Sequence, residues 1–165
     1  TGILLTSNVT TAKVWMHFQV LSNELQSPMV LACPADKTRM RASAEDFSTS
    51  KTGLPHRNNR DSAVSYFVGL RADRTETNAI LAGDRNVSLL EGSPAYSSHA
   101  LGGAIHVSQS STWTDAKPTR LHDLQGNVAL ADGSVQQMTT QKLQDQLALA
   151  TNNYGTNINL FLFPQ

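Results

Sequence analysis

Apolar residues recur with helical spacing near the start of the chain. Over residues 10–25 the repeating positions are Val14, Phe18, Leu21 and Leu25. These steps place the four side chains on one face of an α-helix. A threonine at position 10 or 11 can cap its start. The pair Ser27-Pro28 ends it, because proline lacks the N–H group that the next turn requires.

The middle of the chain has the composition of β-strands. Residues 64–70 and 79–83 are rich in β-branched and aromatic side chains, and the turn-like segment between them predicts a β-hairpin. Residues 104–107 form a third short apolar run. By contrast, residues 36–63 and 84–103 are polar and show no apolar period. They are predicted to be two long irregular insertions.

A second hairpin is predicted where Asp132-Gly133 separates two alternating segments, residues 127–131 and 134–138. An Asp-Gly pair in this position favours a tight primed turn in which both central residues adopt positive φ. Val128 and Leu130 would then share one face of the sheet.

The remaining elements follow this hairpin. Thr139 or Thr140 is expected to cap a helix through about Ala150, with apolar residues on one side. The apolar segment 158–163 is expected to dock on the body of the protein. Strands joined by loops rather than crossover helices predict an antiparallel sheet, so the expected class is α+β in a single domain spanning residues 1–165.

Composition narrows the functional classes. The chain has 165 residues, of which 39% are hydrophobic, and 13 basic residues balance 13 acidic ones. A packed core is therefore expected, whereas electrostatic attraction to nucleic acid or to anionic lipid is not. The abundant hydroxyl and amide side chains (16 Ser, 16 Thr and 11 Asn) favour strands and turns. The apolar runs are shorter than the roughly 20 residues of a membrane-spanning helix.

The single cysteine, Cys33, cannot form an internal disulfide or an all-cysteine zinc site. It lies in an apolar stretch, which predicts a small buried side chain. A catalytic thiolate would need a neighbouring base, and the adjacent sequence contains none.

His122 precedes Asp132 by ten positions, and such a pair can bind a metal or transfer a proton. A metal site needs further ligands, however, and no histidine pair at helical spacing or cysteine cluster is present. We therefore interpret His122, Asp132 and Gly133 as structural. The imidazole would hydrogen-bond the main chain and fix the entry to the hairpin, and the Asp-Gly pair would form the turn.

Two alternatives remain open. Asp84, Asp132 and Asn153 could supply oxygen ligands to calcium, and Trp113 could stack on a sugar, so an extracytoplasmic glycan- or calcium-binding module is the second hypothesis. An enzyme would require His122 and either Asp84 or Asp132 in one cleft with a perturbed pKa. The sequence contains no nucleophile elbow, phosphate loop or dinucleotide fingerprint, and we predict no enzymatic activity and no cofactor.

Four ordered segments carry a family resemblance. The spacing of His122 and Asp132-Gly133, within a run that ends in Ser-Val-Gln-Gln, resembles the H-x9-DG domain of bacterial prepilin-type processing-associated proteins. Residues 31–36, 65–69 and 81–86 are also similar to segments of these proteins.

The resemblance implies a pilin-like or type II secretion pseudopilin-like globular head. Such a head would be displayed outside the cytoplasm, in the periplasm or at the cell surface, and anchored in the inner membrane through an N-terminal apolar helix that this chain does not contain. The implied partners are other pilin-like subunits or the secretion machinery, and no active site is implied.

Overall fold

The computed structural model describes residues 13–37, 44–88, 104–114 and 121–164. Its α-helices are α1 (Val14–Gln19), α2 (Ser22–Leu25) and α3 (Thr140–Tyr154), and its 3-10 helices are η2 (Pro28–Leu31), η4 (Arg60–Ala63) and η6 (Thr156–Asn159). The strands are β1 (Tyr66–Gly69), β2 (Ile80–Asp84), β3 (Val87–Ser88), β4 (Ala104–His106), β5 (Thr112–Trp113), β6 (Gln125–Leu130), β7 (Val135–Thr139) and β8 (Leu160–Leu162).

Six of these strands form one sheet in the order β4-β8-β1-β2-β6-β7, and β3 and β5 form a separate two-stranded sheet. Every strand pair is antiparallel. The protein is therefore α+β with an antiparallel sheet and few helices, as the strand pattern predicted. The C-terminal segment does more than dock, because β8 lies between β4 and β1 inside the sheet.

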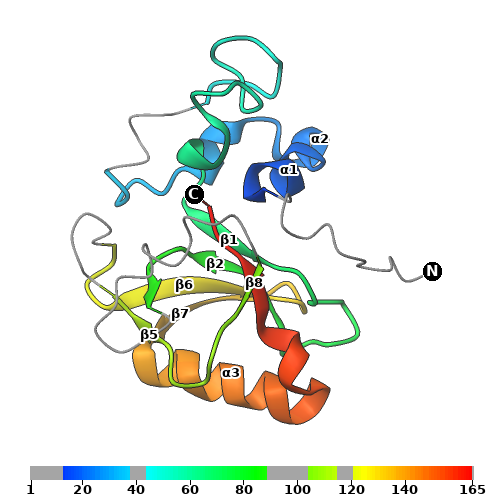
Figure 1. Cartoon of the computed structure of the whole chain (residues 1–165), viewed down its shortest axis with the longest axis vertical. Coiled ribbons are helices and arrows are strands. Elements are labelled where there is room, and N and C mark those ends of the chain that lie inside the picture. The colour runs from blue at the N-terminus through cyan, green and yellow to red at the C-terminus, as the bar shows by residue number, and fades with distance from the viewer. Residues whose placement is uncertain (1–12, 38–43, 89–103, 115–120, 165) are drawn as a thin grey trace.

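The main sheet separates two layers of the protein (Figure 1). The helix α3 lies against one face, and the N-terminal segment with α1 and α2 lies above the other. The alternation of side chains along β8 follows this arrangement: Phe161 packs into the cluster on the α3 side, whereas Leu162 packs with Val14 and Leu31 of the N-terminal layer.

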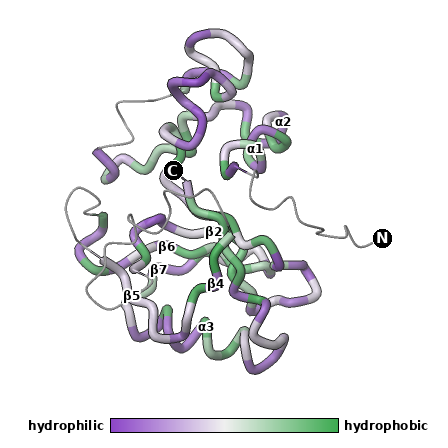
Figure 2. The backbone as a smooth tube through the Cα atoms, viewed as in Figure 1, coloured by the Kyte–Doolittle hydropathy of each residue, from purple (hydrophilic) through white to green (hydrophobic). Residues whose placement is uncertain are grey.

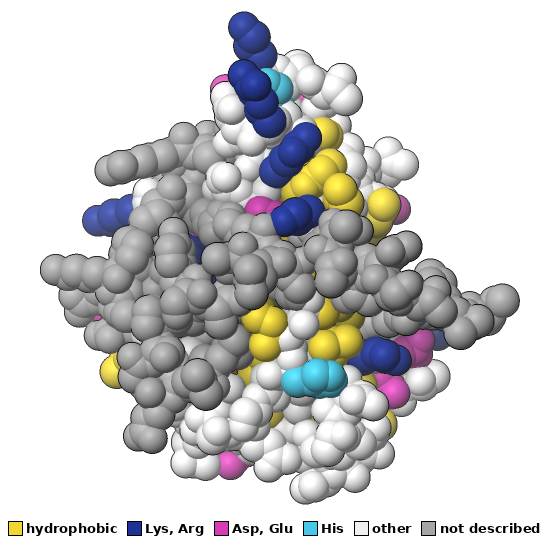
Figure 3. Space-filling model, viewed as in Figure 1, with side chains coloured by type: hydrophobic (Ala, Val, Ile, Leu, Met, Phe, Trp, Pro, Cys, Tyr) yellow, Lys and Arg dark blue, Asp and Glu magenta, His cyan; other side chains and the backbone are white. Residues whose placement is uncertain are grey.

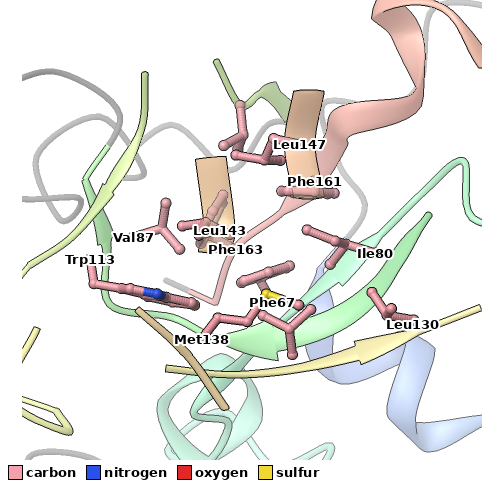
Figure 4. Close-up of a cluster of buried hydrophobic side chains, with 12 residues drawn as sticks. Phe67, Ile80, Val87, Trp113, Leu130, Met138, Leu143, Leu147, Phe161 and Phe163 are labelled. Atoms are coloured by element: carbon pink, nitrogen blue, oxygen red, sulfur yellow. The ribbon is translucent and has the colours of Figure 1, made fainter. Parts of the chain in front are cut away.

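The larger core lies between the sheet and α3 (Figure 4). Phe67 of β1 stacks on Phe161 of β8 with ring centroids 4.8 Å apart. Leu143 and Leu147 of α3 complete the cluster from the other side. Thr139 caps α3 by accepting a hydrogen bond from the Lys142 N–H group, so the predicted helix is confirmed and extends to Tyr154. Figure 2 shows that hydrophobic and hydrophilic residues both occur along α3, as expected for a helix with one face on the core.

The expected single helix over residues 10–25 is wrong for the part that the structure describes. The chain forms two short helices, α1 and α2, with a break at Val20 and Leu21. Val14, Phe18 and Leu25 reach the N-terminal core, but Leu21 is 45% exposed.

The turn between β6 and β7 also differs from the expected one. Only Gly133 of the Asp-Gly pair has positive φ (87°). The Gly133 N–H group donates to the Leu130 carbonyl, and the Leu130 N–H group donates to the Ser134 carbonyl. This is the pattern of a three-residue loop that ends in a left-handed glycine, so the loop contains Ala131 as well as the Asp-Gly pair.

The two segments that were predicted to be irregular, residues 36–63 and 84–103, differ in the parts that the structure describes. Residues 44–63 are rich in turns and contain a 3-10 helix, whereas Val87 and Ser88, expected to be irregular, form β3. The expectations for residues 1–12, 38–43, 89–103 and 115–120 lie outside the described residues. Within the described residues, none of the helices has the length and apolar character to cross a bilayer.

Candidate functional site

Three side chains from distant parts of the sequence converge between the main sheet and the N-terminal layer. Cys33 Sγ lies 3.3 Å from His122 Nε2, and the same nitrogen lies 3.5 Å from Asp84 Oδ2. All three atoms are within 4.8 Å of one another. We refer to Cys33, Asp84 and His122 as the Cys-Asp-His cluster.

Cys33 is positioned by the segment that follows η2. Its N–H group donates to Ser65 Oγ at 3.0 Å, and the Ser65 N–H group donates to the Leu31 carbonyl. Ser65 Oγ in turn donates to Asp36 Oδ2, which is also bound by Arg85. The cysteine is therefore held on both sides by buried hydrogen bonds, and its thiol faces the sheet instead of solvent.

Asp84 is the last residue of β2 and is fully buried. Its Oδ2 atom accepts hydrogen bonds from the main-chain N–H and the side-chain amide of Asn127, at 2.6 and 3.0 Å. Its Oδ1 atom has no hydrogen-bond partner among the described residues. A buried carboxylate with an unpartnered oxygen is costly and calls for an explanation.

His122 reaches the cluster from a left-handed turn. His122, Asp123 and Leu124 all have positive φ, at 54°, 46° and 62°. Non-glycine residues rarely adopt this conformation, and three in succession store backbone strain. Buried Asn86 holds the turn at its base, because its side-chain amide donates to the carbonyls of Leu121 and Gln125 at 3.0 Å each.

The electrostatic environment disfavours charge on the buried members. Burial raises the pKa of the Asp84 carboxyl, and the Asn127 hydrogen bonds and nearby His122 only partly offset this effect. Burial also raises the pKa of the Cys33 thiol. Tyr66, on the adjacent strand β1, has a pKa raised to about 12 by burial and by the neighbouring acidic groups.

This geometry argues against a nucleophilic cysteine. In a relay, the two nitrogens of the imidazole face different partners, one the nucleophile and the other the orienting carboxylate. Here a single nitrogen, Nε2, faces both Cys33 and Asp84. The raised pKa of the thiol keeps it protonated, whereas a reactive cysteine needs a lowered one. Side chains whose donor atoms converge on one point are instead typical of a metal-binding site.

The structure separates residues that the sequence analysis grouped. Asp132 lies in the hairpin loop, where its Oδ1 accepts a hydrogen bond from the Ser134 N–H group, and that bond lowers its pKa. Asn127, which binds Asp84, lies five residues earlier on β6, a span of roughly 16 Å along a strand. Asn153 is exposed in the last turn of α3. Asp84 and Asp132 therefore cannot share the calcium ion that we considered.

Two further interpretations need correction. His122 was expected to hydrogen-bond the main chain, but within the described residues its imidazole contacts the side chains of Cys33 and Asp84. Trp113 is only 2% exposed and belongs to the core, so its ring cannot stack on a glycan. The pairing of His122 with Asp84 was among the arrangements considered, but Cys33 was missed because its partners are 51 and 89 positions away.

The surface offers a second feature. Hydrophobic side chains gather over the N-terminal layer in the space-filling view (Figure 3). The exposed large apolar residues of this layer are Met16, Val20, Leu21, Met29 and Val30. We refer to these five residues as the N-terminal apolar surface. Apolar residues concentrated in this way are typical of surfaces that contact another molecule.

Comparisons with known proteins identify no relative. No family model matches the chain, and no curated protein or solved structure matches it.

Proposed function

We propose that this chain is the globular head of a pilin-like or pseudopilin-like bacterial protein, a non-enzymatic structural or secretion-associated subunit. As the family resemblance implies, the head would be displayed outside the cytoplasm and anchored at the inner membrane. The function of the head would be to pack against neighbouring subunits and to present its loops to binding partners.

One observation carries this proposal. The four segments that resemble the H-x9-DG proteins are spread over more than a hundred positions, and each contributes one residue to a single buried site: Cys33, Ser65, Asp84 and His122. Segments that resembled the family only by chance would not be expected to meet at one site. These segments therefore contribute to the contact between the sheet and the N-terminal layer.

The N-terminal apolar surface supports a packing role. Val20 is 77% exposed and Met29 is 61% exposed, and both belong to the N-terminal layer. In a membrane-anchored assembly this layer would be close to the neighbouring subunits. Burying these side chains between copies would remove apolar area from water and favour association.

The test uses substituted cysteines in the protein expressed from its own gene in its own host. Val20→Cys probes the N-terminal layer, Leu149→Cys on α3 probes the opposite layer, and the unsubstituted protein controls for buried Cys33. We expect a membrane-impermeant maleimide to label both variants from outside the cytoplasm. A short bifunctional maleimide should cross-link Val20→Cys to neighbouring subunits more efficiently than Leu149→Cys.

Each failure of this test has a separate meaning. Absence of labelling from outside would contradict the extracytoplasmic location. Labelling of Val20→Cys without any cross-linked product would contradict the role as an assembly subunit.

A further inference from the structure

We propose that Cys33, Asp84 and His122 bind one divalent transition-metal ion of the zinc class, with a fourth position left for water or another ligand. The donor set is one sulfur, one nitrogen and one oxygen, all belonging to side chains of the Cys-Asp-His cluster. This combination suits zinc and its borderline-soft neighbours. Calcium prefers six to eight oxygen ligands and does not fit it.

The distances are close to those a shared ion would require. Zinc binds a thiolate at about 2.3 Å and imidazole nitrogen or carboxylate oxygen at about 2.0–2.2 Å, so ligand atoms around it lie roughly 3.3–3.7 Å apart. The distances from His122 Nε2 to Cys33 Sγ and to Asp84 Oδ2 are 3.3 and 3.5 Å. The three ligand atoms all lie within 4.8 Å of one another, so the sulfur and the oxygen would move closer together on binding.

The unpartnered oxygen of Asp84 is the independent observation that points to a cation. Asp84 is completely buried, and its Oδ1 atom has no hydrogen-bond partner among the described residues. The neighbouring cation, Arg85, pairs with Asp36. A divalent ion would compensate the buried carboxylate, and the thiolate would complete the charge balance.

Outer contacts hold each ligand in place. Asn127 donates two hydrogen bonds to Asp84, Ser65 accepts one from the main chain of Cys33, and Asn86 anchors the turn that carries His122. Metal sites depend on such contacts to orient their ligands. The His122 side chain is 24% exposed, which gives an ion a path from solvent.

The experiment uses the untagged chain after treatment with a chelator. Zn²⁺ is titrated by calorimetry, and Co²⁺ is added in parallel because its absorption spectrum reports a thiolate ligand and tetrahedral geometry directly. We expect one ion per chain, a thiolate-to-cobalt charge-transfer band, and a rise in melting temperature with Zn²⁺, because the ion binds the folded state.

Variants then assign the ligands. Cys33→Ser and His122→Gln should weaken zinc binding by about 100-fold or more, and Asn127→Ala, which removes one outer hydrogen bond, by about 10- to 100-fold. His106→Gln, at an exposed histidine on β4, is the matched control and should bind zinc like the unsubstituted protein. Asp84→Asn should melt at a higher temperature without metal, because it removes a buried charge, and should lose the zinc-dependent rise.

Three results would overturn the proposal. They are the absence of zinc binding by the unsubstituted chain, a cobalt spectrum without the thiolate band, and zinc binding that persists in Cys33→Ser and His122→Gln. The cobalt spectrum requires no variant, so the test holds even if a substitution prevents folding. It is also independent of whether the protein assembles with other subunits.

Discussion

Asp36 and Arg85 form a bidentate ion pair in the interior, although they are 49 positions apart in the chain. The Nε–Oδ2 and Nη2–Oδ1 distances are 2.6 and 2.9 Å, and the side chains are 1% and 4% exposed. The pair joins the segment after η2 to the end of β2, next to the Cys-Asp-His cluster. It therefore fixes the distance between two of the proposed ligands.

Arg85→Met should destabilise the protein by about 3–5 kcal/mol, because it removes the cation that pairs with the buried Asp36 carboxylate. The double variant Asp36→Asn/Arg85→Met should recover part of this loss. Urea unfolding followed by circular dichroism measures both. Arg71→Met, at an exposed position, is the control. A loss below about 1 kcal/mol for Arg85→Met would mean that the pair does not hold these segments together.

Gly126→Ala should destabilise the protein by about 1–3 kcal/mol through overpacking. A Cβ atom at this position would come within 2.4 Å of the Trp113 ring, which is buried in the core. Gly133→Ala is the informative comparison, because no atom lies within 4 Å of its Cβ and only its positive φ opposes substitution, at about 1–2 kcal/mol. The free energy of unfolding should therefore fall in both variants.

The two glycine variants should differ in the packing that they disturb. Gly126→Ala should change the near-ultraviolet circular dichroism of the buried tryptophan, whereas Gly133→Ala should leave it unchanged. An unaltered tryptophan signal in Gly126→Ala would show that the ring does not rest on this strand.

Asn86→Ala should loosen the turn that carries His122. The substitution removes the amide that binds the carbonyls of Leu121 and Gln125, and loss of the donor to the buried Leu121 carbonyl alone costs about 1–3 kcal/mol. Hydrogen exchange should accelerate at residues 121–125 more than in α3. Asn58→Ala, at an exposed position, should not change it. Equal protection of the turn in both variants would contradict the anchoring role.

Stability should fall as the pH decreases below about 6.5, in part because of His17. Burial lowers the pKa of this histidine from its usual 6.5, and nearby Asp61 offsets the effect only partly. Above pH 6.5 the imidazole is neutral in both states. Below it, the unfolded chain binds the proton first, so unfolding is favoured.

His17→Gln should therefore lose less stability than the unsubstituted protein between pH 7 and 5, as measured by urea unfolding at each pH. His106→Gln controls for the loss of an imidazole at an exposed position. An identical pH dependence in His17→Gln and the unsubstituted protein would rule out this contribution.

Local patterns predicted much of the secondary structure. The alternating residues of β6, the Asp-Gly pair and the threonine that caps α3 are local signals, and the corresponding elements are present. The errors arose where packing overrides such signals. Trp113 lies in a polar segment and was considered as a residue that stacks on a sugar, yet its ring is in the core because Gly126 leaves room for it.

The candidate site shows the same difference between what local sequence signals predict and what tertiary packing decides. The sequence identified His122 and Asp84 individually, and it showed that Cys33 lies in an apolar stretch. It paired His122 with the nearer Asp132, because spacing along the chain was the available guide. In the structure β6 lies between these two residues, with the turn of His122 before the strand and the loop of Asp132 after it.

The sequence by itself determined the α+β class, the antiparallel hairpins and the capped C-terminal helix, because these depend on side-chain periodicity and turn chemistry within a few residues. Only the tertiary structure decided that Cys33, Asp84 and His122 meet at one nitrogen, and that Asp36 neutralises Arg85. Those contacts join residues 38 to 89 positions apart. They arise when the N-terminal layer packs on the sheet, and no local sequence pattern predicts that packing.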